Sequence, residues 1–128
     1  MRIVIVNMKD YIFADAVAQS LQADTESGFV VQKATSPEEV IKYCSLYNPY
    51  AVMMETTGNF PYLLEERLKT RDQIKKSAPD CKVVLVVDEN SDKEVAKKVR
   101  QAKKDSIIDQ FIYGSVSASY MVALMDTL

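Results

Sequence analysis

The sequence contains no histidine, and this absence excludes several classes of active site. Ser-His-Asp triads, Cys-His pairs, histidine phosphocarriers and nearly every common catalytic zinc site need an imidazole. Glycine is also scarce, because only Gly28, Gly58 and Gly114 occur in 128 residues. Nucleotide-binding loops of the Walker or G-x-G-x-x-G type need closely spaced glycines, so neither is present. Much of ordinary hydrolytic and nucleotide-dependent enzymology is therefore excluded.

Cysteine and net charge are both low, and together they restrict the compartment and the partners. The two cysteines, Cys44 and Cys81, lie in apolar surroundings, where we expect reduced structural thiols rather than a disulfide. Sixteen basic and eighteen acidic residues give a net charge of −2, so no strong field favours nucleic acid or an anionic membrane. The apolar run Ile3–Val6 is too short for a signal peptide or a membrane span. We predict a cytoplasmic protein that binds neither nucleic acid nor membrane.

Five short apolar runs rich in β-branched residues predict five strands. The first, third and fourth are continuous rather than alternating, which is typical of strands buried on both faces of a parallel sheet. Segments with helical spacing separate the runs at 11–23, 37–47, 62–76 and 92–104, and a last helix extends to Leu128. The predicted strands are Ile3–Val6, Phe29–Gln32, Ala51–Met54, Val83–Val87 and Ile107–Tyr113.

Helix-start signals support this alternation of strands and helices. Ser36–Glu39 and Ser91–Glu94 both read as S-x-x-E capping boxes, and Ser115 or Ser117 can cap the last helix. Five successive strand–helix units predict a doubly wound α/β fold, a flavodoxin-like (βα)5 three-layer sandwich formed by residues 1–128. The expected order of the parallel sheet is 2-1-3-4-5, with a ligand site at the carboxyl ends of the strands.

The residues at those strand ends carry a resemblance to a known family. Asn7 and Met8 end the first strand, Glu55 the third and Val87 the fourth, and Gly114 follows the fifth. In pattern and spacing the whole chain resembles the CheY-like receiver domain of two-component response regulators. That family is known for an acidic pair, a phosphoacceptor Asp, a Thr or Ser and a Lys at these five places. The resemblance therefore implies a receiver whose signature residues are largely replaced.

These replacements work against phosphoryl transfer to the chain itself. Such a transfer needs a carboxylate nucleophile, Mg²⁺ held by carboxylates, and a cation on the developing charge. Met8 offers no hard oxygen, Asn7 only a neutral one, and Glu55 is one methylene longer than Asp. Val87 has no hydroxyl and Gly114 no ammonium. The sequence thus predicts a pseudo-receiver that is not an enzyme and holds no cofactor.

The chemistry of Glu55 leaves alternatives open. Its carboxylate is either a fixed charge that imitates a phosphorylated state or an ordinary solvated group. Imitation would act through the strand-five aromatic of the family, whose position Phe111 occupies. With Asp10, Asp88 and Glu89, Glu55 could also form a weak Mg²⁺ or Ca²⁺ site, although exposed loop carboxylates give the same pattern. The alternative functions are a working, Mg²⁺-dependent receiver of a two-component phosphorelay and a small-molecule sensor that uses the vacated pocket.

Two helices suggest a protein partner. The predicted fourth helix carries six basic residues within 93–104, which form either a solvated face or a docking surface for an acidic partner. The last helix is apolar almost all round, so we expect an interface at Tyr120, Met121, Leu124 and Met125. In receivers the face made by helix 4, strand 5 and helix 5 is the output and dimer surface. The resemblance therefore implies a signalling module acting by protein contact, as a homodimer or as the N-terminal domain of a longer protein with a C-terminal output domain.

Overall fold

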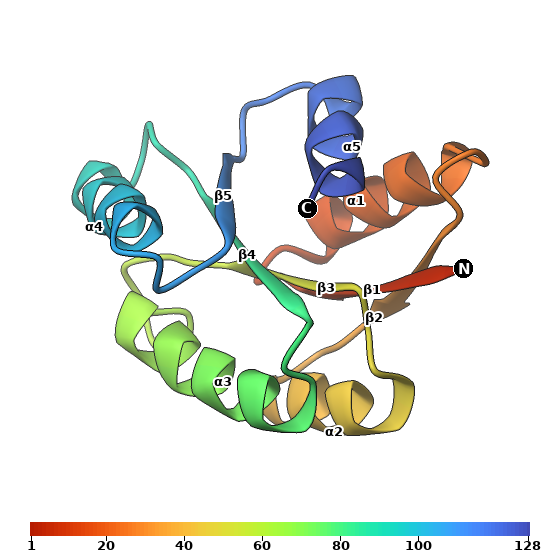
Figure 1. The fold of residues 1–128 in the computed structure, drawn as a ribbon. Helices are drawn as coiled ribbons and strands as arrows, with labels where there is room; N and C mark the ends of the chain where they lie inside the picture. The colour runs from red at the N-terminus through yellow and green to blue at the C-terminus, as the bar shows by residue number, and fades with distance from the viewer.

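The computed structural model describes all 128 residues and contains five strands that alternate with five helices (Figure 1). The strands form one sheet in the order β2-β1-β3-β4-β5, and every neighbouring pair is parallel. The predicted fold class and strand order are therefore confirmed. The strands are β1 (Arg2–Asn7), β2 (Phe29–Lys33), β3 (Ala51–Glu55), β4 (Lys82–Val87) and β5 (Gln110–Tyr113).

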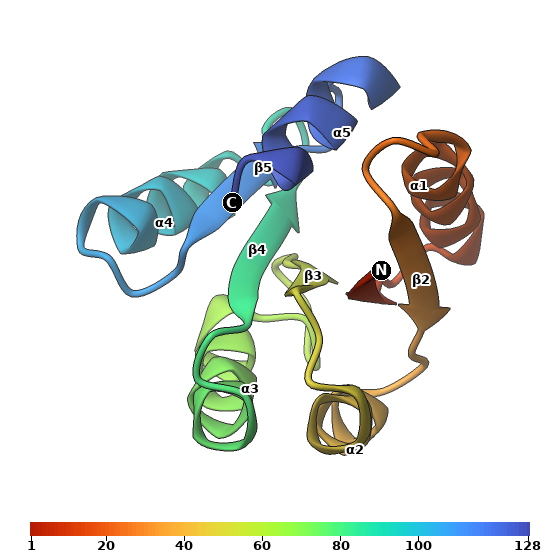
Figure 2. The same ribbon diagram turned by 45° about the vertical axis from the view of Figure 1, so that its right-hand side comes forward.

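The helices cover both faces of the sheet, as the two views in Figures 1 and 2 show. Helices α1 and α5 pack on one face, and α2, α3 and α4 pack on the other. None of the five is both long enough and apolar enough to cross a lipid bilayer. The helices are α1 (Tyr11–Ala23), α2 (Pro37–Tyr47), α3 (Leu64–Ser77), α4 (Lys93–Lys104) and α5 (Ala118–Asp126).

Strand β3 explains why the central apolar runs are continuous. Successive side chains of a strand point to opposite faces, and here both faces are covered by helices. Val52 and Met54 pack with α2, α3 and α4, whereas Ala51 and Met53 pack with α1 and α5. All four are fully buried. Glu55 ends this run where the strand leaves the core.

Helix caps follow the sequence prediction at two of three sites. The Ser36 hydroxyl accepts a hydrogen bond from the Glu39 amide at 3.1 Å, as the first capping box predicts. Ser117, one of the two residues predicted to cap the last helix, caps α5. The prediction of a second capping box at Ser91–Glu94 was wrong, because the N-cap of α4 is Asp92, which makes no side-chain cap bond. The Asp88 carboxylate instead accepts hydrogen bonds from the amides that follow it, so Ser91 belongs to a turn.

Strand β5 is shorter than the run Ile107–Tyr113 predicted. Ser106 adopts a left-handed conformation with φ of 59°, and the Ile107 amide donates to the Ala102 carbonyl. The chain is therefore still leaving α4 at these residues. Asp109 then accepts a hydrogen bond from the Val83 amide at 2.7 Å, and pairing begins at Gln110.

Helix α5 buries part of the interface that its composition suggested. Met121 is 6% exposed and Met125 is fully buried, because they lie four residues apart on the stripe that faces the sheet. The prediction that these two methionines form an interface was therefore wrong. Tyr120 is 54% exposed and Leu124 half-buried, so only these two remain accessible to a partner.

The two cysteines lie in the same core cluster as free thiols. Cys44 belongs to α2, and Cys81 immediately precedes β4. The neighbouring Cys44 sulfur and burial both raise the pKa of the Cys81 thiol. A buried thiol with a raised pKa has little thiolate character, so Cys81 acts here as a small apolar side chain, and Cys44 is equally buried beside it.

Candidate functional site

A crevice of about 290 Å³ opens at the carboxyl ends of β3, β4 and β5. Parallel strands of a doubly wound sheet end together at this edge, which is where such folds bind ligands. Three of the residues predicted from the sequence, Glu55, Val87 and Gly114, lie in its walls. The complete lining is Asp10, Phe13, Glu55, Val86, Val87, Asp88, Asn90, Gly114 and Ser115.

The carboxylate of Glu55 is tied to the loop that follows β1. Its Oε1 atom accepts hydrogen bonds from the backbone amides of Lys9 at 2.7 Å and Asp10 at 3.3 Å. The extra methylene of Glu relative to Asp gives the side chain this reach. The acid at the end of β3 therefore holds the β1–α1 loop in place.

The other acidic side chains around the crevice are also used by their own loops. Asp10 caps α1 by accepting from the amides of Ile12 and Phe13. Hydrogen bonds from the Asn90 amide and from Ser91 lower the pKa of Asp88. Glu89 accepts from the Ser115 hydroxyl at 3.0 Å. Each carboxylate thus has a structural role that needs no ligand.

These carboxylates lack positive partners and do not converge on one point. None of Asp10, Glu55, Asp88 and Glu89 takes part in an ion pair, and no Lys or Arg lines the crevice. No group of three or more His, Cys, Asp or Glu side chains is arranged to hold a metal ion. The four acids considered as a weak Mg²⁺ or Ca²⁺ site are therefore dispersed around the rim.

A buried arginine from α3, Arg67, contacts the ends of β1 and β3 outside the crevice. The Arg67 side chain is completely buried, and its Nη1 donates to the Asn7 Oδ1 at 2.7 Å. Its Nε donates to the Glu55 carbonyl oxygen at 2.9 Å, and Nη2 donates to the Asn7 carbonyl at 3.3 Å. The guanidinium also lies 5.2 Å from the centre of the Tyr62 ring. One cation therefore joins the ends of β1 and β3.

The Arg67 guanidinium forms no ion pair with a carboxylate. Burial lowers its pKa to about 10, and the nearby Tyr62 and Glu55 oppose that change. The Asn7 amide completes the network by donating to the Ala34 carbonyl at 2.9 Å. Neutral oxygens thus supply all three hydrogen bonds that the guanidinium makes.

Sequence reasoning missed Arg67, because an arginine in a strongly charged helix is ordinarily solvated. Helical spacing over 62–76 predicts an inner stripe of Leu64, Leu68, Arg71 and Ile74–Lys75. The buried residues of α3 are Arg67, Thr70 and Ile74, so only Ile74 of the predicted stripe lies fully inward. The signal was the seven-residue spacing from Arg67 to the one β-branched apolar residue of the helix, Ile74.

The remaining predicted residues lie outside the crevice. Asn7 is 1% exposed and lines a separate polar hollow beside α2 and α3. Met8 is buried among the side chains of the α1 and α5 face. Phe111 is half-buried on β5 and packs edge-on against Tyr113, with ring centres 5.4 Å apart. The structure thus gathers three of the five predicted pocket residues and separates Asn7 and Met8 from them.

Comparison with known proteins gives matches to solved structures only. No protein-family model matches the chain, and no curated protein matches its sequence. A CheY-like protein from Pseudomonas aeruginosa PAO1 superposes with a TM-score of 0.73 at 16% identity, covering 99% of this chain and 98% of that one. The response regulator TrrA from Thermotoga maritima, solved with Mg²⁺ and BeF, gives 0.73 at 18% identity with 99% and 98% coverage. The chain has the fold of a response regulator receiver domain.

A third match shows the receiver fold in a different setting. A structure described as a streptococcal redox sensor evolved from two-component response regulators superposes with a TM-score of 0.77 at 9% identity. The match covers 99% of this chain and 50% of that one, so the receiver fold there is part of a longer protein. At these identities the comparisons establish the fold of this chain.

Within this receiver fold, helix α4 presents a cationic face. It carries six basic residues and one acidic residue, and its inward stripe is Ala96, Val99 and Ala102. A shallow hollow of about 350 Å³ between this helix and Phe111 is lined by Lys97, Arg100, Gln101, Lys103 and Lys104. The guanidinium of Arg100 donates to the Tyr113 hydroxyl at 3.0 Å and so fixes part of this face to β5.

Proposed function

We propose that the chain is a non-catalytic receiver-like signalling module that works in the cytoplasm through contact with a protein partner. The observation that carries the proposal is Arg67. Its guanidinium donates to both oxygens of Asn7 and to the Glu55 carbonyl oxygen, and so it links the ends of β1 and β3. The sheet edge is thus held together by a cation that belongs to the chain.

The geometry of the crevice argues in the same direction. An aspartyl-phosphate site needs hard oxygen ligands that converge on Mg²⁺ and a cation for the phosphoryl oxygens. Here the Asn7 amide oxygen faces Arg67, the Glu55 Oε1 is engaged by two amides, and the crevice wall contains no lysine. Each departure works against phosphoryl transfer, and together they support a module that signals without being phosphorylated.

The α4–β5 face supports an acidic partner rather than a second copy on that face. Two copies that met through α4 would bring six cations against six others with only Glu94 on each side to compensate. A partner with Asp and Glu residues would find complementary charge there, with Phe111 as an apolar contact. Tyr120 and Leu124 on α5 extend the accessible apolar surface of the module.

Binding of beryllofluoride with Mg²⁺ tests the proposal, because this pair imitates a phosphorylated carboxylate. We expect nitrogen-edited NMR spectra to remain unchanged at the amides of Lys9, Asp10 and Ser115, and acetyl phosphate to add no mass to the intact protein. Glu55→Gln is the matched control, since it keeps an oxygen for the two amide bonds but removes the charge. Shifts centred on Glu55 that disappear in this variant would establish a working phosphoacceptor and overturn the proposal.

A further inference from the structure

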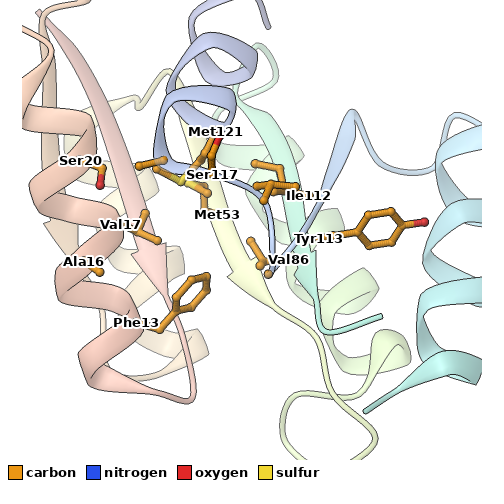
Figure 3. A pocket seen from close by; sticks show the side chains of 13 residues that line it. Phe13, Ala16, Val17, Ser20, Met53, Val86, Ile112, Tyr113, Ser117 and Met121 are labelled. Atoms are coloured by element: carbon orange, nitrogen blue, oxygen red, sulfur yellow. The ribbon is translucent and has the colours of Figure 1, made fainter. Parts of the chain in front are cut away.

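An apolar cavity lies between α1 and α5, against the face of the sheet that they cover (Figure 3). It has a volume of about 170 Å³, and ten of its thirteen lining residues are hydrophobic. In Figure 3 the side chains of Phe13 and Val17 extend from α1 toward the strands. The buried side chains at its base and far wall are Met53, Val86, Ile112 and Met121.

Small side chains at the helix surfaces keep this cavity open. Ala16 and Ser20 stand on α1, and Ser117 and Ala118 begin α5, where larger residues would close the gap. Tyr113 contributes little of its ring, which points away from the cavity toward α4 (Figure 3). A volume near 150 Å³ lined by apolar groups is known in another protein to accept benzene. The space therefore suits one aromatic ring.

The cavity adjoins the acidic crevice described above. Phe13, Val86 and Gly114 line both hollows, so the two share a wall. On the crevice side, Asp10, Glu55 and Asp88 carry negative charges without an ion-pair partner. The acids do not converge closely enough for a metal ion, but they surround a space wide enough for an organic cation.

We propose that the two hollows form one binding site for a small organic cation, with its apolar ring in the α1–α5 cavity and its ammonium group in the crevice. Charge complementarity selects the cation, since carboxylates line the crevice and no basic side chain does. The apolar lining favours an aromatic ring, because a water molecule in this cavity would lack hydrogen-bond partners. The proposal rests on the proposed function in one respect, namely that no metal holds the crevice.

Phenethylammonium is the probe, and phenylacetate and phenylethanol carry the same ring with a negative and a neutral end. We expect phenethylammonium to shift the amides of Phe13, Gly114 and Ser115 in nitrogen-edited NMR. Phenylacetate should bind at least about tenfold more weakly, a difference that added salt reduces. Equal binding of the three probes, or no shift at about 10 mM phenethylammonium, a weak ligand's range, would overturn the proposal.

Matched variants test each half of the site. Ser20→Phe fills the cavity from α1, and Gln19→Phe adds the same ring to an exposed neighbour that does not line it. Glu55→Gln removes a crevice charge, and Glu26→Gln removes one from an exposed turn at the far end of α1. Ser20→Phe and Glu55→Gln should each weaken phenethylammonium binding about fivefold or more, while the two controls stay within about twofold. Unchanged affinity in both test variants would refute the site.

Failure of the proposed function and failure of the amine site would give different results in these experiments. Beryllofluoride binding with Mg²⁺ would overturn the proposed function whatever the amine does, since it is measured without the amine. Absence of amine binding alongside silence toward beryllofluoride would remove only the ligand site. If Ser20→Phe fails to fold, Ala16→Leu adds bulk to the same wall at an exposed position and takes its place.

Discussion

Replacing Arg67 with methionine removes the cation that joins β1 and β3, and the structure allows its effect on stability to be worked out. Burial lowers the pKa of Arg67 from its ordinary value to about 10, which corresponds to a cost of about 3 kcal/mol for holding the charged form. The variant is relieved of that cost. It also loses three hydrogen bonds and leaves the oxygens of Asn7 and the Glu55 carbonyl without their donor.

The losses outweigh the relief. Each buried acceptor left without a donor costs about 1–3 kcal/mol, and bonds to a charged donor are at the stronger end of that range. Three such acceptors exceed the cost of burying one guanidinium, so we expect Arg67→Met to lower the free energy of unfolding by about 3 kcal/mol. In urea denaturation followed by circular dichroism, the midpoint should fall by about 1–2 M with an unchanged slope.

Two comparisons make this prediction specific. Arg71→Met, one turn further along α3, removes an arginine that bonds only to the neighbouring Asp72 carboxylate and should change stability by less than about 0.5 kcal/mol. Adding Asn7→Leu to Arg67→Met removes the orphaned amide oxygen, so the double variant should recover about 1 kcal/mol relative to additivity. An Arg67→Met protein as stable as the parent would refute the reasoning.

Three further predictions follow from the caps, from one ion pair and from the thiols. Ser36→Ala should cost about 1 kcal/mol, whereas Ser91→Ala should cost less than about 0.5 kcal/mol because it caps nothing; equal losses in thermal denaturation would contradict the cap assignment. Asp109 forms an ion pair with Lys75, whose Nζ lies 2.9 Å from the Asp109 Oδ2. Burial raises the pKa of Asp109, but hydrogen bonds from the Val83 amide and from Lys75 outweigh it and hold the pKa below its usual 3.8. A lowered carboxyl pKa adds stability above about pH 4 that is lost as the pH falls further, so Asp109→Asn should flatten the stability profile in that acidic range, and an unchanged slope would count against the pair. Cys44 and Cys81 should react with a thiol reagent only as fast as the protein unfolds, and immediate labelling of the native protein would contradict their burial.

The fold could be predicted because its signals are local and agree with one another. The continuous apolar runs at β1, β3 and β4 require cover on both faces, and only a parallel sheet between helices provides it. Errors arose where a short motif competed with its neighbours. The Ser91 amide donates to the Asp88 carboxylate, so Ser91 lies in a turn and does not cap α4. At Ile107 the apolar sequence pattern continues, although the backbone has already turned at Ser106.

The candidate site was only partly predictable, because it depends on contacts between distant segments. Glu55, Val87 and Gly114 could be placed together from strand ends alone. The direction of Asn7 could not, since it is set by Arg67, sixty positions along the chain. The composition of α5 did not show which of its faces is buried. The helix is apolar almost all round, and only its packing decides that Met121 and Met125 face the sheet.

The guanidinium of Arg67 has a consequence for how this protein would respond to its surroundings. A divalent ion at a strand end comes and goes with its concentration, and a chelator can strip it away. An arginine held by three hydrogen bonds inside the core cannot dissociate. The link between the ends of β1 and β3 should therefore hold at any magnesium concentration, because its cation is part of the chain.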